Sequence, residues 1–259
     1  MRYRELAPRD RLKSLVAGFW AFPATEHEHR VLPDGCMDIV VIDGRARLVG
    51  TMRKAVVVPP STAAVVGVRF RPGEVARLCS GSPRELTDSD SLLCDVWGDD
   101  GRRLEDALLA LVEDATRRKL AAEAIVRRAL PFVEKALYRR LASHAAPADL
   151  PIRAAALLLA EGVSVRDAAQ QAGLSERHLA RRFIERVGVS PRTFTRVRRL
   201  QRAAFELQRG AKPAQVAALV GYADQPHFTR EASALAGTTP TALFRELSDG
   251  LDTSVPVVL

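Results

Sequence analysis

The spacing of apolar positions divides the chain into a β-rich first part and a helical remainder. Up to about residue 98, short β-branched runs are separated by the turn sequences Pro-Asp-Gly, Asp-Gly, Pro-Pro-Ser and Arg-Pro-Gly, which predicts strands joined by tight turns. These runs lie at 37–42, 47–49, 55–58 and 64–70. From about residue 99 onward, apolar residues recur every three or four positions, as in amphipathic helices. We therefore expect an α+β N-terminal domain, with a β-rich part over 1–98, followed by an all-α domain.

The segment 99–145 carries apolar stripes at helical spacing. One stripe begins at Leu104 and a second begins at Ile125. Such stripes need a covering partner, so this helical segment is a candidate dimerisation surface. Pro131 is expected to begin or interrupt a helix, because proline lacks the amide hydrogen and its ring clashes with the preceding turn. Residues 146–151, which contain two prolines, are expected to be a linker.

Two stretches within the last hundred residues predict the same arrangement. Residues 165–187 and 214–236 each contain a short alanine-rich helix, a glycine-containing turn and a second helix with one polar side. Their turn glycines, Gly173 and Gly221, are 48 positions apart. One helix-turn-helix has many uses, whereas two in tandem are much rarer. We therefore expect residues 152–248 to form a DNA-binding domain with two helix-turn-helix units joined by a linker helix.

Capping residues define the second, or recognition, helix of each unit. Ser175 is the expected N-cap of a helix that ends near Val187, and Asp224 is the expected N-cap of a helix that ends near Leu235. In both helices the apolar residues recur on one side, which leaves the other side free for a ligand.

The predicted linker helix begins at the Ser190-Pro191 pair and ends before Gly210. About 17 residues span roughly 25 Å, which would hold the two recognition helices close to one turn of B-DNA apart, ~34 Å. One monomer would then read two successive segments of the major groove. The outward positions of this helix are Arg196, Arg199 and Arg202.

Positive charge is concentrated in the same region. The chain has a formal net charge of +8, and residues 177–212 alone contain eleven arginines and lysines against two acidic residues. A basic stripe of this kind is typical of proteins that bind phosphate backbones. The alternative is that arginine simply serves as the common surface cation of this chain. The coincidence with the helix-turn-helix units favours DNA.

Polar residues on the free faces of the recognition helices have the types that read bases. Arginine suits the O6 and N7 atoms of guanine, and glutamine suits adenine. The predicted base contacts are Arg177, Arg181, Gln225, Pro226, Thr229 and Arg230. The predicted contacts to the DNA backbone or near it are His178, Arg182, Arg196, Arg199 and His227. For each of these residues the alternative is a solvated helix face.

The sequence VAALVGYADQPHFTREASALAGTTPTALFRE, residues 216–246, contains a GY-x-D-Q-x-x-F-x-R core, a Gly237-x-x-Pro240 step and a final Phe-Arg. With the unit before it, this stretch resembles the DNA-binding domain of the AraC/XylS family of bacterial transcription regulators. The resemblance implies base-reading roles for the six residues named above. The family usually has Phe-Lys where this chain has Glu231-Ala232, so we expect the second recognition helix to bind the DNA backbone less well.

The N-terminal part resembles an uncharacterised sensor-like domain that precedes this module in one AraC-type subgroup. The resemblance is carried by HRVLPDGCMDIVV (29–41) and GVRFRPGEVARL (67–78). It implies a regulatory or dimerising role but names no ligand. The expected partners are promoter DNA, RNA polymerase, a second copy of the chain and an unidentified small-molecule effector, with no cofactor.

Two other readings of the chain remain open. His27, His29 and Cys36, with Asp34 and Asp38, form a candidate soft-metal or thiol-sensing site, although a cysteine before a buried strand commonly behaves as a small hydrophobic residue. Alternatively, the helical pairs bind a partner protein, as in an adaptor.

An enzyme is not expected. The three cysteines, Cys36, Cys79 and Cys94, are not clustered as zinc ligands would be, and no catalytic grouping is visible. Their odd number indicates a reducing compartment. No apolar run approaches the ~18–20 residues of a membrane span, and no signal peptide is visible. We therefore expect a cytoplasmic protein that associates with the nucleoid when it binds DNA.

Overall fold

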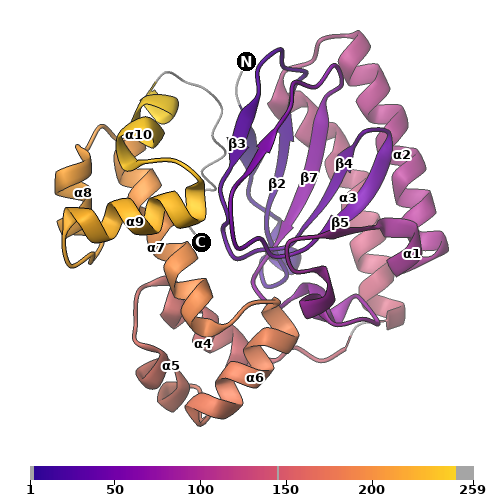
Figure 1. The fold of residues 1–259 in the computed structure, drawn as a ribbon. Coiled ribbons are helices and arrows are strands. Elements are labelled where there is room, and N and C mark those ends of the chain that lie inside the picture. Colours follow the sequence, from indigo (N-terminus) through magenta and orange to yellow (C-terminus); the bar gives the residue numbers. More distant parts are fainter. Residues whose placement is uncertain (1–2, 145, 249–259) are drawn as a thin grey trace.

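The computed structural model describes residues 3–144 and 146–248, which form a sheet domain followed by a helical domain (Figure 1). The main sheet has the order β1-β2-β7-β4-β5-β8, and every neighbouring pair is antiparallel. Its strands are β1 (Arg4–Leu6), β2 (Val16–Phe22), β4 (Asp38–Ile42), β5 (Arg45–Val49), β7 (Val65–Phe70) and β8 (Asp90–Leu92). A separate antiparallel pair consists of β3 (His29–Val31) and β6 (Val56–Val58).

Alternation along the strands separates the two faces of the sheet. On β4, Ile39 and Val41 belong to the main core, whereas Val40 lies on the opposite face with Trp20 and Phe22 of β2. The four predicted strand runs correspond to β4, β5, β6 and β7, so these predictions are confirmed. The sequence pattern missed β2, a central strand, because its VAGFWAF run is apolar on both faces and has no polar alternation.

Two long helices cover the main core. They are α2 (Asp99–Arg117) and α3 (Ala122–His144), and they follow the short α1 (Leu93–Trp97). Leu104 and Leu108 of α2 and Ile125 of α3 are buried in the same core as the sheet (Figure 1). The apolar stripes of these helices are therefore covered within the monomer, and the reason for expecting a dimer seam there is removed.

Pro131 does not begin or interrupt a helix. It lies inside α3, which continues from Ala122 to His144. Pro131 is exposed, so the carbonyl group that loses its partner one turn earlier can bind water instead. The prediction of a break there was wrong for this reason.

The helical domain consists of seven helices among the described residues. They are α4 (Leu150–Ala160), α5 (Val165–Gln171), α6 (Glu176–Val187), α7 (Pro191–Gln208), α8 (Pro213–Leu219), α9 (Gln225–Ala236) and α10 (Pro240–Ser248). The predicted fold class, an α+β domain followed by an all-α domain with two helix-turn-helix units, is confirmed. Residues 150 and 151 lie in α4 rather than in a linker, because Asp149 caps this helix and proline is tolerated in its first turn.

The helical domain has two cores, and α7 joins them (Figure 1). The first contains Phe183 and Phe194, whose ring centroids lie 5.3 Å apart in an edge-to-face arrangement. The second contains Leu200, Tyr222 and Phe228. Since α7 contributes residues to both cores, one continuous helix connects the two helix-turn-helix units.

Candidate nucleic-acid interface and ligand cavity

The first helix-turn-helix unit consists of α5 and α6. The Ser175 hydroxyl accepts a hydrogen bond from the backbone N–H of His178 at 3.3 Å, which starts α6 at the predicted residue. Arg177 and Arg181 are exposed one turn apart, and neither has a hydrogen-bonding or ion-pair partner within the described residues. Both guanidinium groups are thus available to an external acceptor. His178 is exposed beside them.

The second unit consists of α8 and α9. Asp224 Oδ1 accepts a hydrogen bond from the backbone N–H of His227 at 2.6 Å, which starts α9 at Gln225 as predicted. Gln225, Pro226 and Arg230 are exposed. The Thr229 hydroxyl donates to the backbone oxygen of Gln225 at 3.0 Å, so it is already occupied within the helix.

His227 is held in place on the edge of this unit. Its ring packs edge-on against Tyr222 with centroids 5.3 Å apart, and Nδ1 accepts a hydrogen bond from the backbone N–H of Ala223 at 3.4 Å. The ring is partly exposed, and its contact with DNA stays a prediction.

Two of the arginines predicted to contact the DNA backbone, Arg196 and Arg199, form ion pairs with Glu231 within the chain. The Glu231 carboxylate accepts hydrogen bonds from Arg196 Nε at 2.9 Å and from Arg199 Nε and Nη2 at 3.0 and 2.9 Å. The guanidinium of Arg199 also lies 4.6 Å from the ring centroid of Tyr222. Glu231 therefore joins α9 to α7, a packing role that the sequence did not reveal.

Arg182, the third arginine predicted to contact the DNA backbone, is also engaged within the chain. Arg182 Nη2 donates to Asp149 Oδ1 at 2.7 Å, and this same oxygen accepts from the first turn of α4 at the backbone N–H of Ile152. Arg202, expected to face outward, donates from Nη1 to the backbone oxygen of Glu161 at 3.2 Å. The two arginines therefore stabilise the first half of the helical domain, and a role toward phosphate stays a prediction.

The turn 33–36 of the sheet domain contacts α7 directly. Gln201 Nε2 donates to the backbone oxygen of Pro33 at 2.6 Å, and Arg198 Nη1 donates to that of Asp34 at 3.3 Å. Gly35 has φ +82°, and a Cβ atom there would lie 2.5 Å from Cε2 of Phe194. The turn therefore needs a glycine both for its backbone conformation and for its close approach to α7.

Replacement of Gly35 by alanine is expected to lower the free energy of unfolding by about 2–4 kcal/mol, through left-handed backbone strain together with overpacking against Phe194. Urea titration of the full chain measures this change. Gly44→Ala is the matched control, because Gly44 also has positive φ (+69°) but nothing lies within 4 Å of its added Cβ. Equal losses in the two variants would show that the contact with Phe194 contributes nothing.

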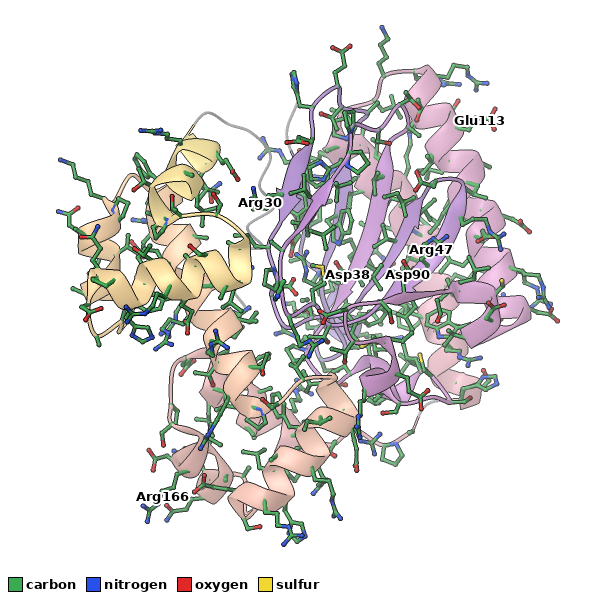
Figure 2. All side chains as sticks on the ribbon, viewed as in Figure 1. Arg30, Asp38, Arg47, Asp90, Glu113 and Arg166 are labelled. Atoms are coloured by element: carbon green, nitrogen blue, oxygen red, sulfur yellow. The ribbon has the colours of Figure 1, made fainter. Side chains whose placement is uncertain are left out.

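The sheet domain also contacts both halves of the helical domain. Near the C-terminus of α6, the hydroxyl groups of Thr51 and Thr87 donate to the backbone oxygens of Val187 and Gly188 at 2.5 and 2.7 Å. Near α10, Arg30 Nε forms an ion pair with Glu246 at 2.9 Å (Figures 1 and 2). These contacts leave the N-terminal turns of both recognition helices exposed.

A cavity of about 540 Å³ lies on the sheet face opposite α2 and α3. Trp20 and Val40 line it from the sheet, and Val31, Val56 and Val58 line it from β3 and β6. This volume is within the range of small-molecule sites. Trp20 lies across Gly67, where a Cβ atom would come within 2.3 Å of the indole ring, so the glycine makes room for this wall.

One end of the cavity holds a buried cluster of charges. Arg69 Nη1 lies 2.8 Å from Glu5 Oε2, Arg69 Nε lies 2.7 Å from Asp34 Oδ2, and Arg69 Nη2 lies 3.5 Å from Asp38 Oδ2. Tyr3 hydrogen-bonds to both Glu5 and Arg69. Burial raises the pKa of Asp38 to about 7, although the Arg69 guanidinium opposes this shift. The sequence pointed to Asp34 and Asp38 but not to Arg69, Glu5 or Tyr3, because these residues come from distant stretches of the chain.

The residues proposed from the sequence as a metal or thiol-sensing site differ in arrangement and burial from such a site. Within residues 3–144 and 146–248, no group of three or more histidine, cysteine or acidic side chains is arranged to hold a metal ion. His27 is exposed, whereas Cys36 is buried in the turn 33–36. Burial raises the pKa of the Cys36 thiol well above its usual value, which leaves little of the reactive thiolate at neutral pH.

Comparisons with known proteins cover both domains. Residues 168–246 match a family described as "Helix-turn-helix domain", and residues 4–91 match a "Domain of unknown function". The chain is 32% identical over 68 residues to the "Uncharacterized HTH-type transcriptional regulator YbfI" of Bacillus subtilis (strain 168). This match covers 26% of the chain and only 25% of the relative, so the chain spans about a quarter of the length of that protein.

Solved structures with a similar arrangement include ToxT from Vibrio cholerae O395, at 10% identity and a TM-score of 0.45, covering 95% of this chain and 97% of that one. The apo structure of a ToxT point variant from Vibrio cholerae strain SCE256 has 11% identity and a TM-score of 0.48, with 95% and 96% covered. No helix within the described part of the chain has the length and apolar character to cross a membrane. The match to the helix-turn-helix family thus covers α6 to α9 and most of the paired helix-turn-helix units.

Proposed function

We propose that the protein is a sequence-specific DNA-binding transcriptional regulator whose DNA affinity is controlled by a small molecule bound in the sheet domain. The observation that supports it most directly is the pair of exposed recognition-helix faces. Arg177 and Arg181 on one face, and Gln225 and Arg230 on the other, project from two units that share α7. These are the side-chain types that discriminate bases in the major groove.

The regulatory part of the proposal rests on the position of the cavity. Asp34 contributes its carboxylate to the charged end of the cavity and its backbone oxygen to Arg198 of α7. A ligand that moves the turn 33–36 therefore alters the packing of the helix that carries both units. RNA polymerase contact and self-association belong to the proposal as further steps of regulation.

The DNA-binding part is tested with the purified full-length chain and labelled duplexes. A binding site is first selected from a random library, and its affinity is compared with that of a scrambled duplex at two salt concentrations. We expect a preference of about a thousandfold or more for the selected site and a steep fall of affinity with salt. If the two duplexes bind equally weakly, the adaptor reading, in which the helical pairs bind a protein, replaces this proposal.

A further inference from the structure

The inner end of the cavity holds more buried acid than base. Three carboxylates, from Glu5, Asp34 and Asp38, surround the single guanidinium of Arg69. From α7, the buried Arg198 adds a second guanidinium, which donates a hydrogen bond to the backbone oxygen of Asp34. An unbalanced buried charge is costly, so a site of this composition favours either a bound proton or a bound cation.

Aromatic rings form the wall next to these carboxylates. The rings of Tyr3 and Phe22 lie with centroids 5.1 Å apart, those of Phe22 and His29 lie 4.8 Å apart, and Trp20 packs against both Tyr3 and Phe22. All four side chains line the cavity. The faces of such rings attract cations as well as apolar groups.

We propose that the cavity binds a lipophilic organic cation, an aryl- or alkyl-ammonium whose apolar body lies against the aromatic wall and whose charge lies beside Asp38. This inference rests on the proposed role of the cavity as the effector site. Trp20 is the hydrogen-bonding neighbour of the Asp38 carboxylate, and the enclosed Oδ1 has no close hydrogen-bond partner among the described residues, so the carboxylate can still accept a hydrogen bond from an ammonium group.

An organic anion fits the same cavity poorly. Arg69 is already surrounded by carboxylates, and Arg47 of β5, the strand next to β4, forms an ion pair through Nη1 with Asp90 at 2.6 Å. Figure 2 shows Asp38 near the middle of the molecule, with Arg47 and Asp90 toward β5. An anion would therefore have to displace an acidic side chain to reach either arginine, and Lys54, which also lines the cavity, is exposed to solvent.

Binding of a cation is expected to be linked to the release of a proton from Asp38. The groups that face Asp38 are Arg69 of β7, Trp20 of β2, Glu5 of β1 and Asp34 of the turn, and Arg198 of α7 lies behind Asp34. Since the pKa of Asp38 is about 7, its carboxyl group is protonated below that pH and carries no charge to pair with the ligand. Ammonium affinity should therefore fall by about tenfold in total as the pH drops from 8 to 6.

The test uses three probes of one shape: 4-phenylbutylammonium, 4-phenylbutan-1-ol and 4-phenylbutanoate. Binding to the full-length chain is measured by calorimetry and by quenching of tryptophan fluorescence, since Trp20 lines the cavity. At pH 8 the ammonium should bind at least about tenfold more tightly than the alcohol, and the carboxylate more weakly than the alcohol.

Asp38→Asn should reduce ammonium affinity to that of the alcohol and leave alcohol binding unchanged. Glu113→Gln, which removes an exposed acid of α2 far from the cavity, is the matched control and should change neither (Figure 2). If Asp38→Asn does not fold, the pH dependence of ligand binding to the unaltered chain tests the proposal. The affinity for the ammonium should fall between pH 8 and 6, whereas the affinity for the alcohol should not change.

Equal binding of ammonium and alcohol, tighter binding of the carboxylate, or no binding of any probe at millimolar concentration would overturn this proposal. The DNA-binding measurement on the same protein preparation is independent of these outcomes. If the protein binds DNA sequence-specifically but does not prefer the ammonium, only the proposed ligand class is rejected. If the protein shows no sequence-specific DNA binding, the proposed function itself is rejected.

Discussion

A variant that carries both Arg177→Ala and Arg181→Ala is expected to bind the selected DNA site about a hundredfold more weakly, because each good bidentate contact to a base contributes about 1–3 kcal/mol. Both arginines are exposed on α6 and unpaired within the described residues, so their removal leaves the fold of the domain intact. Fluorescence anisotropy with the selected and the scrambled duplex measures the effect. The loss should be much smaller on the scrambled duplex.

The matched control removes two exposed arginines from the sheet domain. Arg4→Ala with Arg11→Ala lowers the net charge by the same amount at positions away from the recognition helices. It should change both affinities little. If the α6 variant instead loses the same factor on both duplexes, Arg177 and Arg181 bind phosphate groups, and their predicted base contacts are wrong.

Replacement of Glu231 by alanine is expected to lower the free energy of unfolding by about 3 kcal/mol, because it removes the buried partner of two arginines. The Glu231 side chain is 5% exposed, whereas those of Arg196 and Arg199 are 45% and 21% exposed. The arginines can therefore turn partly toward water, which places the loss at the lower end of the range for broken buried pairs. Chemical denaturation of the full chain measures it.

A double-mutant cycle with Arg199→Ala separates the ion pair from other effects of the substitution. The two single changes should not add, since they remove the same interaction. Ser233→Ala, an exposed position on the same helix, serves as the control and should change stability by less than about 0.5 kcal/mol. Full additivity of Glu231→Ala and Arg199→Ala would show that the pair contributes nothing to the junction of α7 and α9.

Local features made the helical domain predictable. Ser175, Ser190 and Asp224 cap α6, α7 and α9 through their side chains, as the sequence predicted, because a cap depends on residues within the same turn. The exposed faces of the recognition helices follow from the period of the buried residues in the same way. These predictions needed no knowledge of the rest of the fold.

Contacts between distant segments were not predictable. Glu231 was expected to weaken DNA binding, yet it lies 35 residues from Arg196 in sequence and pairs with it in space. In the same way, the apolar stripe of α2 indicated a partner but could not identify the sheet of the same monomer. The charged cluster joins Asp34 and Asp38, which were grouped from the sequence, to Glu5 and Arg69, whose sequence positions give no indication of proximity.

On the proposed function, the contacts of the sheet domain with both halves of the helical domain affect the length of DNA that the protein would recognise. Thr51 and Thr87 bind the C-terminal end of α6, and Arg30 binds α10. The distance between the two recognition helices is therefore fixed by the sheet domain as well as by α7. The isolated helical domain would then tolerate insertions or deletions between the two halves of its target that the full chain rejects. On the proposed function, the sheet domain therefore helps to set the spacing between the two halves of the DNA site.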